Sequence, residues 1–461
     1  MSTTNLRNVH SPGTLITRIH GVWYDLTPFL NKHPGGAKAL SLVAGRDGTV
    51  LFESQHQFSS KSLMRSTLNQ YRITDQKMIN NLKTLEEIDS ETLGHNAEKV
   101  EGLFEWPEGG SEFAKELVTS VRNYFTNEAK RRKVTMKEAI KATPMKKLEL
   151  LLLCVPFMIS FIYLLQASFI SLFTFPIFTW LFIANVFHDA SHYGFSSKPW
   201  INVGVSYLFP YFSSPSTWAV QHIVGHHSYP NIAHRDPDVA HTKDFRRDHP
   251  EMKWKNPHEF QANWLNLGIH WLMSITFGLC IANEYEAYFK GCLSYNDAVP
   301  VVPFSKMRLL AHLASRFFTA VVVLFWPFYV LQEANFITKL AFSIIPSFIF
   351  SFCFMVNTQI NHLSPDTINK SKDWYVHQII TAQNFGEQSY LHYLFSGGLN
   401  MQAEHHLFPT VNHCHLRYIQ PIVKELCIKH GIQYNMASGY IECVKKYMTH
   451  TKNMAKQVKS D

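Results

Sequence analysis

Residues 150–187 form an uninterrupted stretch of 38 residues without a charged side chain. A helix that crosses the hydrocarbon core of a bilayer needs about 20 mostly apolar residues, so this stretch is long enough for two crossings. The composition agrees, because 46% of the residues are apolar and only 17% are charged, which is low for a soluble protein. We therefore expect two membrane-spanning helices here, with a turn near residues 171–176.

Two further apolar segments, at about 309–331 and 338–357, predict a second pair of spans. Arg316 lies in the first of them, where its side chain can reach the headgroups if it is near a helix end.

A fifth uncharged stretch, 260–283, could also cross the membrane. If the histidine clusters on either side of it meet in one site, however, an even number of crossings must separate them. We therefore expect 260–283 to lie in the interface or to re-enter the membrane.

The formal net charge of +8 could indicate a nucleic-acid partner. The basic residues instead stand beside the apolar segments, as at Lys146, Lys147, Lys306 and Arg308. This arrangement is typical of the cytosolic side of a membrane, and we expect no nucleic-acid partner. The seven cysteines form an odd set without a CxxC pair, which indicates reduced thiols rather than a disulfide framework.

Three polar segments beside the predicted spans are rich in histidine. In a helix, histidines four residues apart share one face, so each segment can aim several imidazoles at one point. Imidazole close to the bilayer is costly unless it is paired, protonated or bound to metal. Seven clustered histidines exceed the ligands of a single zinc site, so two ions are needed, and imidazole suits iron, copper, nickel or zinc. The segments are HDASH at 188–192, HIVGHH at 222–227 and QAEHH at 402–406.

The order HxxxH, HxxxHH and QxxHH resembles the membrane fatty acyl desaturases, and the glutamine that heads the third box resembles their front-end branch. The resemblance implies a di-iron site that uses dioxygen to remove two hydrogens from an unactivated acyl chain. By the same resemblance, the implied iron ligands are His188, His192, His222, His226, His227, His405 and His406.

Several other residues near the boxes can also be interpreted. Gln402 occupies a position that is histidine in other desaturase branches, which leaves open whether it binds iron. His362, in QINH after the fourth predicted span, resembles an additional ligand. Asp189, Asp236 and Asp238 could orient ligand imidazoles or serve only as caps and turn residues. His234, His241 and His413 match no box, and we expect them at the surface.

A second signal lies near the N-terminus, where HPGG at 33–36 is followed by FESQH at 52–56. In the frame HGVWYDLTPFLNKHPGG…AGRDGTVLFESQH, these segments resemble cytochrome b5. The resemblance implies haem b with His33 and His56 as its axial ligands. The expected pocket lining is Leu30, Leu40, Val43 and Phe52.

These features predict a small α+β haem-binding domain followed by an all-α integral membrane domain with four transmembrane helices and cytosolic histidine boxes. The expected boundaries are 12–75 for the cytochrome b5-like domain, 76–110 for a polar linker on which it swings, and 111–445 for the membrane di-iron domain.

Desaturation reduces dioxygen to two waters, and two of the four electrons must come from outside the substrate. A haem with two histidine ligands has no open position for dioxygen, so it carries electrons instead. The resemblance implies that a cytochrome b5 reductase drawing on NADH loads the haem, with the protein in the endoplasmic reticulum membrane. It also implies a polyunsaturated acyl substrate, a new cis bond on the carboxyl side of an existing one, and delta-5 ahead of delta-6 specificity.

Three other functions remain as alternatives. A sphingolipid long-chain-base desaturase would share the chemistry. A lipid hydroxylase fused to cytochrome b5 would space its histidine boxes differently. A membrane metal transporter would place histidines or acids within its spans, and 150–187 contains none.

Overall fold

The N-terminal part of the chain is organised around two antiparallel strands, β1 (Ile16–Ile19) and β2 (Val22–Asp25). His20 and Gly21 connect them with positive φ angles of 49° and 74°, which suit a tight hairpin turn. Short helices follow and carry the two histidines of the haem motif at their ends. They are η1 (Thr27–Lys32), α2 (Ala37–Leu40), η2 (Ser41–Val43), α3 (Thr49–Gln55), α4 (Lys61–Asn69) and α5 (Gln76–Ile79).

The expected linker is partly packed against the rest of the protein. Phe104 stacks on Tyr229 and Trp106 stacks on Trp374, each with ring centroids 6.1 Å apart. Two helices then lead to the membrane segments: α7 (Glu112–Arg132) and α8 (Met136–Ala139). This is a computed structural model, and it describes residues 14–88, 102–107, 110–207, 215–240, 246–252, 259–273, 293–295, 298–301 and 306–456.

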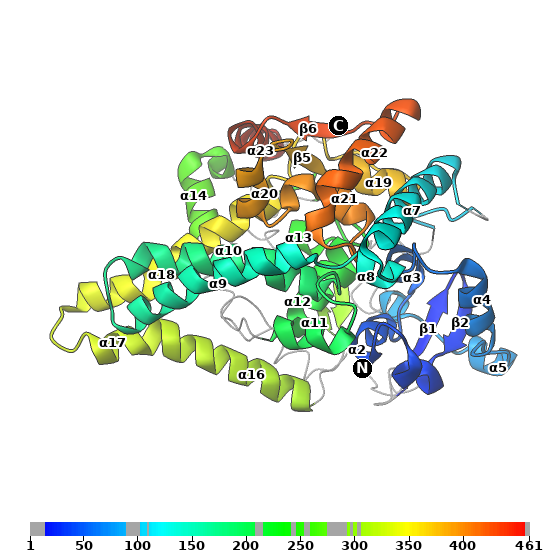
Figure 1. Ribbon diagram of the computed structural model, residues 1–461, viewed down its shortest axis with the longest axis horizontal. Helices are drawn as coiled ribbons and strands as arrows, with labels where there is room; N and C mark the ends of the chain where they lie inside the picture. The colour runs from blue at the N-terminus through cyan, green and yellow to red at the C-terminus, as the bar shows by residue number, and fades with distance from the viewer. Residues whose placement is uncertain are drawn as a thin grey trace.

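Three long helices form an elongated bundle that extends away from the haem domain: α9 (Pro144–Leu165), α10 (Ser171–Ser191) and α18 (Phe336–Gln359) (Figure 1). Within the described residues, three helical segments are long and apolar enough to cross a membrane, and they contain these helices. Large apolar side chains of α9 point outward, including Leu151, Leu152 and Val155. This outer surface suits contact with lipid.

The turn between the first two membrane helices lies several residues earlier in the sequence than expected. It lies between Leu165 and Ser171, whereas the sequence predicted a turn at 171–176. Pro176 was interpreted as part of the turn but lies inside α10. Both α9 and α10 contain an internal proline, and proline in an apolar span is tolerated when neighbouring helices satisfy the freed backbone groups.

The expected third span forms a continuous helical segment from Lys306 to Val330, divided into α16 (Lys306–Ala320), η6 (Val321–Phe325) and α17 (Trp326–Val330). Only the stretch from Val321 to Val330 is strongly apolar. Four crossings therefore stay a prediction.

The all-α expectation for the membrane domain was wrong in two places, where short strand pairs occur. β3 (Leu293–Tyr295) pairs antiparallel with β4 (Val299–Val301), and β5 (Gln383–Phe385) pairs parallel with β6 (Asn435–Ala437). The buried side chain of Asn384 in β5 donates to the carboxylate of Glu404 and accepts from the amide of Ala403.

The remaining helices surround the inner end of the bundle. They are α11 (Pro199–Ser206), α12 (Pro215–Trp218), the π-helix η3 (Ala219–His226), α13 (Pro237–Ala240), η4 (Glu259–Ala262), α14 (Trp264–Met273), α19 (Trp374–Ile380), α20 (Tyr390–Ser396), η7 (Leu399–Met401), α21 (Gln402–Leu407), η8 (His413–His415), α22 (Leu416–Lys429) and α23 (Tyr440–Ala455).

Candidate metal centre and haem site

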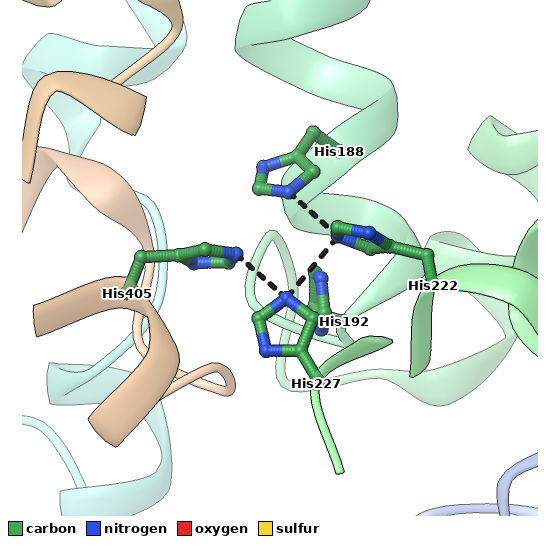
Figure 2. A group of neighbouring side chains, drawn as sticks. All are labelled: His188, His192, His222, His227 and His405. Atoms are coloured by element: carbon green, nitrogen blue, oxygen red, sulfur yellow. Dashed lines mark hydrogen bonds between the residues drawn. The ribbon is translucent and has the colours of Figure 1, made fainter. Parts of the chain in front are cut away.

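Five histidines converge at the inner end of the bundle, one nitrogen of each lying within 4.8 Å of the others. Figure 2 shows His405 approaching from the side opposite His222, with His188, His192 and His227 between them. We call this set the five-histidine group: His188, His192, His222, His227 and His405. All five side chains are buried.

The spacing of these nitrogens suits ligands of one metal ion. The Nε2 atoms of His188 and His222 are 3.1 Å apart, and the Nε2 atom of His227 lies 3.2 Å from that of His222 and 3.0 Å from that of His405. Two nitrogens bound to one ion at about 2.1 Å are about 3.0 to 3.4 Å apart. The five-histidine group therefore has the dimensions of a metal site.

Three other buried histidines, His226, His362 and His406, form a second set, which we call the three-histidine group. The Nε2 atoms of His226 and His362 are 3.2 Å apart. The side-chain amide of Gln402 lies beside them, with its nitrogen 2.8 Å from Nε2 of His362. The structure thus places His362 and Gln402 next to the boxes, and the eight histidines divide into two sets.

The second box differs from the helical geometry that the sequence predicted. We expected an α-helix with His222 and His226 on one face, but Ala219–His226 is a π-helix, and the amide of His227 donates to the carbonyl of His222 at 2.9 Å. This i, i+5 bond places His222 and His227 together in the five-histidine group, while His226 joins the three-histidine group.

The third box reaches both groups because neighbouring residues of a helix point about 100° apart. His405 joins the five-histidine group and His406 the three-histidine group. The chain before this box passes very close to α10, since a Cβ atom on Gly397 would lie 2.5 Å from the carbonyl oxygen of Ala184. Glycine at this position, with φ of 63°, lets the first and third boxes meet.

Hydrogen bonds from outside fix the orientation of the three-histidine group. The Nδ1 atom of His226 donates to the carboxylate of Asp236 at 3.1 and 3.2 Å. The Nδ1 atom of His362 donates to the carbonyl of Thr381 at 3.0 Å, and that of His406 donates to Oε1 of Gln378 at 2.8 Å. Such bonds leave each Nε2 free for a metal.

Gln378 was missed by the sequence analysis. Its side chain also donates to the carbonyl of His227 at 3.1 Å, so it links the second and third boxes. It lies outside every histidine motif, in α19, and no pattern in the sequence marks it.

The three aspartates near the boxes have different environments. Asp236 bonds His226, whereas Asp238 lies 3.6 Å from the same Nδ1 atom. Asp189 bonds no box histidine and instead contacts Asn412 and His413, each at 2.6 Å. His413 is therefore buried, contrary to our expectation that it lies at the surface, while His234 is exposed and His241 lies outside the described residues.

The protonation of these histidines suits metal ligation. Burial and neighbouring imidazoles lower the pKa of His222, His227, His405 and His406 well below its usual range, so these rings are neutral and their lone pairs are available. Burial alone would also lower the pKa of His226, but the carboxylates of Asp236 and Asp238 raise it to about 9. The same negative field favours a metal cation at this position.

Some ring nitrogens lack any hydrogen-bond partner. These include both nitrogens of His192 and Nε2 of His406, all of them buried. An unsatisfied buried polar atom is costly, and metal coordination would remove that cost. The residues present therefore fit two metal ions.

The haem motif is also assembled. The rings of His33 and His56 are neighbours, with centroids 6.0 Å apart and ring planes at 74°. Two imidazoles that bind one metal from opposite sides at about 2.0 Å have centroids about 6 Å apart. Their Nδ1 atoms donate to the carbonyls of Gly36 and Phe52, at 3.4 and 2.8 Å. Both Nε2 atoms are thereby left for an iron. The expected lining residues Leu30, Leu40, Val43 and Phe52 belong to the surrounding apolar cluster.

Comparison with known proteins gives two family matches. Residues 161–438, more than half of the chain, match the model described as fatty acid desaturase. Residues 2–79 match the cytochrome b5-like heme/steroid binding domain.

Several curated proteins are similar over nearly the whole chain. The probable Delta(5) fatty acid desaturase C of Dictyostelium discoideum is 27% identical over 95% of this chain and 91% of its own. The acyl-lipid omega-13 desaturase of Chlamydomonas reinhardtii is 28% identical over 90% of this chain and 88% of its own. The acyl-lipid (8-3)-desaturase of Mortierella alpina is 28% identical over 98% of this chain and 96% of its own. All eight clustered histidines lie within the matched segment, and the chain belongs to the fatty acid desaturase family, with a cytochrome b5-like domain at its N-terminal end.

Proposed function

We propose that this protein is a front-end fatty acyl desaturase that holds two iron ions in its histidine groups and receives electrons through haem b. The observation that carries the proposal is the division of eight buried histidines into two adjacent groups within a desaturase domain. In this proposal the five-histidine group holds one iron and the three-histidine group, with Gln402 beside it, holds the other.

Iron bound at the two groups would supply the activation of dioxygen and the removal of two hydrogens from the acyl chain. The protein's own residues set the conditions for that chemistry. Asp236, Gln378 and the Thr381 carbonyl hold three imidazoles in one tautomer. The buried position of both groups excludes bulk water, which would otherwise compete for reactive species.

The arrangement in the membrane is part of the proposal. Four crossings, formed by α9, α10, the helical segment Lys306–Val330 and α18, would place the histidine boxes and the haem domain on one side. Basic residues near the ends of these segments, such as Lys147 and Lys306, support the cytosolic side. We propose the endoplasmic reticulum membrane as the location, with a cytochrome b5 reductase drawing on NADH as the electron source.

For the position of the new double bond, we propose delta-5 specificity on a twenty-carbon polyunsaturated chain, with delta-6 as the alternative. Relatives named Delta(5) desaturases over nearly the full length support this choice. A relative at similar identity is named an omega-13 desaturase, so the position must be measured on this protein.

The test is expression in a host without polyunsaturated lipids, fed separately with a twenty-carbon triene and an eighteen-carbon diene. We expect a new cis bond at the fifth carbon of the longer acid, located by mass spectrometry of derivatised products. A bond on the methyl side of the existing ones would contradict the front-end assignment. A bond at the sixth carbon of the shorter acid would overturn only the delta-5 choice.

A further inference from the structure

The haem domain contacts the desaturase domain directly after His56. Gln57 is buried, and its side-chain amide donates to the backbone carbonyl of Leu407 at 2.7 Å. Leu407 directly follows His406 of the three-histidine group. One hydrogen bond therefore joins the neighbour of a haem-motif histidine to the neighbour of a metal-site histidine.

Aromatic packing holds this contact in place. Phe58 stacks on Phe408 with ring centroids 5.7 Å apart and an interplanar angle of 17°. Its edge also meets Phe125 of α7, again at 5.7 Å. Phe408 and Phe125 are fully buried, so the segment after His56 is inserted into the desaturase core.

The backbone of the same segment is fixed as well. The guanidinium of Arg122 donates to the carbonyls of Gln57 and Ser59, at 2.6 and 3.4 Å. Gln57 is thus hydrogen-bonded to two separate segments of the desaturase domain, α7 through Arg122 and the end of the third box through Leu407.

We propose that Gln57 and Phe58 form the electron-transfer junction between the haem and the three-histidine group, along the path His56, Gln57, Leu407, His406. This inference rests on the proposed function. Electron tunnelling decays less steeply through covalent and hydrogen bonds than through empty space, and this path consists of covalent bonds and one short hydrogen bond. With haem at His33 and His56 and iron at the three-histidine group, each passage would carry one electron from ferrous haem, leaving it ferric, to a ferric iron at that group, leaving it ferrous. A flavin-containing reductase, the electron source in the proposed function, would restore the ferrous haem between the two passages of each turnover.

The junction predicts a specific role for the Gln57 amide. Leucine at this position has a similar size but cannot donate a hydrogen bond, while glutamate places a carboxylate against the Leu407 carbonyl. Loss of one ordinary hydrogen bond corresponds to a factor of about five in the equilibrium constant between the joined and separated states, and the electronic path is interrupted as well. Gln70→Leu is the matched control, because Gln70 lies on the exposed surface of the same domain.

The experiment uses the full-length holoenzyme in detergent, with the haem reduced anaerobically and mixed with oxygen and acyl substrate in a stopped-flow spectrometer. We expect haem reoxidation to slow at least about fivefold in Gln57→Leu and Gln57→Glu, and Gln70→Leu to match the wild type. The haem absorption spectrum and the iron content should stay unchanged in all three variants.

Hydrogen exchange of the peptides around residues 57–59 and 407–411 provides a second measurement that does not depend on turnover. Phe58→Ala should increase exchange in both peptides and slow reoxidation, because the contact itself opens. Wild-type reoxidation rates in Gln57→Leu and Phe58→Ala would overturn the junction. A wild-type protein that makes no desaturated product would refute the proposed function, whereas a productive wild type with unaffected Gln57 variants would refute the junction alone.

Discussion

At the scale of single residues, the metal centre depends on which direction each imidazole faces. His226 and His227 are neighbours in sequence, and so are His405 and His406, yet each pair is divided between the two histidine groups. Every group therefore contains residues from distant segments. A single substitution removes a ligand from one group and leaves the other group assembled.

His227→Ala tests the five-histidine group. The Nε2 atom of His227 lies within 3.2 Å of those of His222 and His405, so its loss opens the middle of the group. Mutation of residues that only hydrogen-bond to a metal ligand typically lowers metal affinity or activity 10- to 100-fold. Loss of a ligand itself should have a larger effect, so we expect product formation to fall at least about 100-fold. Iron content by mass spectrometry should drop while the haem spectrum stays intact. His234→Ala, at an exposed site, is the control, and full iron with full activity in His227→Ala would contradict the assignment.

Gln378→Leu tests the residue that the sequence patterns did not reveal. Without the acceptor at 2.8 Å from Nδ1 of His406, that imidazole loses its fixed tautomer. We expect iron to be removed by chelator about 10- to 100-fold more readily. Gln378→Glu keeps an acceptor oxygen and should retain most of the iron. Equal iron retention in both variants would show that Gln378 only fills space.

At the scale of elements, the sequence predicted the histidine boxes and the apolar spans but not how the boxes are wound. The histidines were recognisable because their spacing and their apolar neighbours are both local properties of the sequence. The division of the histidines into two groups depends on the π-helix at Ala219–His226. A π-helix closes its hydrogen bonds between residues five apart rather than four, and no local sequence pattern marks this difference. The role of Gln378 could not be read from local sequence, because its partner His406 lies 28 residues further along the chain.

Gly225→Ala tests the packing of the second-box helix. A Cβ atom at Gly225 would lie 2.5 Å from Cδ of Pro237 and 2.8 Å from Cγ2 of Val299, and the rigid proline ring cannot move aside. We expect a loss of about 1–3 kcal/mol in the free energy of unfolding, with reduced iron content. Thermal unfolding in detergent measures the first effect.

Gly204→Ala provides the matched control for that prediction. Gly204 also lies in a helix, but a Cβ atom there would meet nothing within 4 Å. Alanine favours the helix by roughly 0.5–1 kcal/mol over glycine, so this variant should be as stable as the wild type or slightly more so. Destabilisation in both variants would mean that the contact with Pro237 is not the cause.

At the scale of the whole molecule, the haem domain and the membrane bundle lie on opposite sides of α21, which carries the third box (Figure 1). An apolar cluster continues from the haem domain into the second-box helix, joining Val43 and Leu51 to Val220 and Val224. The sequence predicted two domains joined by a swinging linker. It could not predict this shared core, since the apolar residues of each part look like ordinary interior residues of that part.

The topology of the chain can be tested with glycosylation acceptors in microsomes. We expect tags at the N-terminus, at the C-terminus and near Asp244, which lies outside the described residues, to be cytosolic, and a tag at Ala334 to be lumenal. Of the segment 260–283, the structure describes α14, which has ten residues, while residues 274–283 lie outside the described part of the chain. A lumenal C-terminus would show that the segment 260–283 crosses the membrane, and the two sets of boxes could then not meet.

The three boxes are spread from His188 to His406, and this separation has a consequence for biosynthesis. A ribosome adds about 5 to 20 residues per second, so roughly ten to forty seconds pass between the synthesis of the first box and that of the last. During this interval the two groups lack His405 and His406, and neither metal position can close. Loading of the two proposed iron ions would therefore come only after the third box has been synthesised, late in the maturation of the protein.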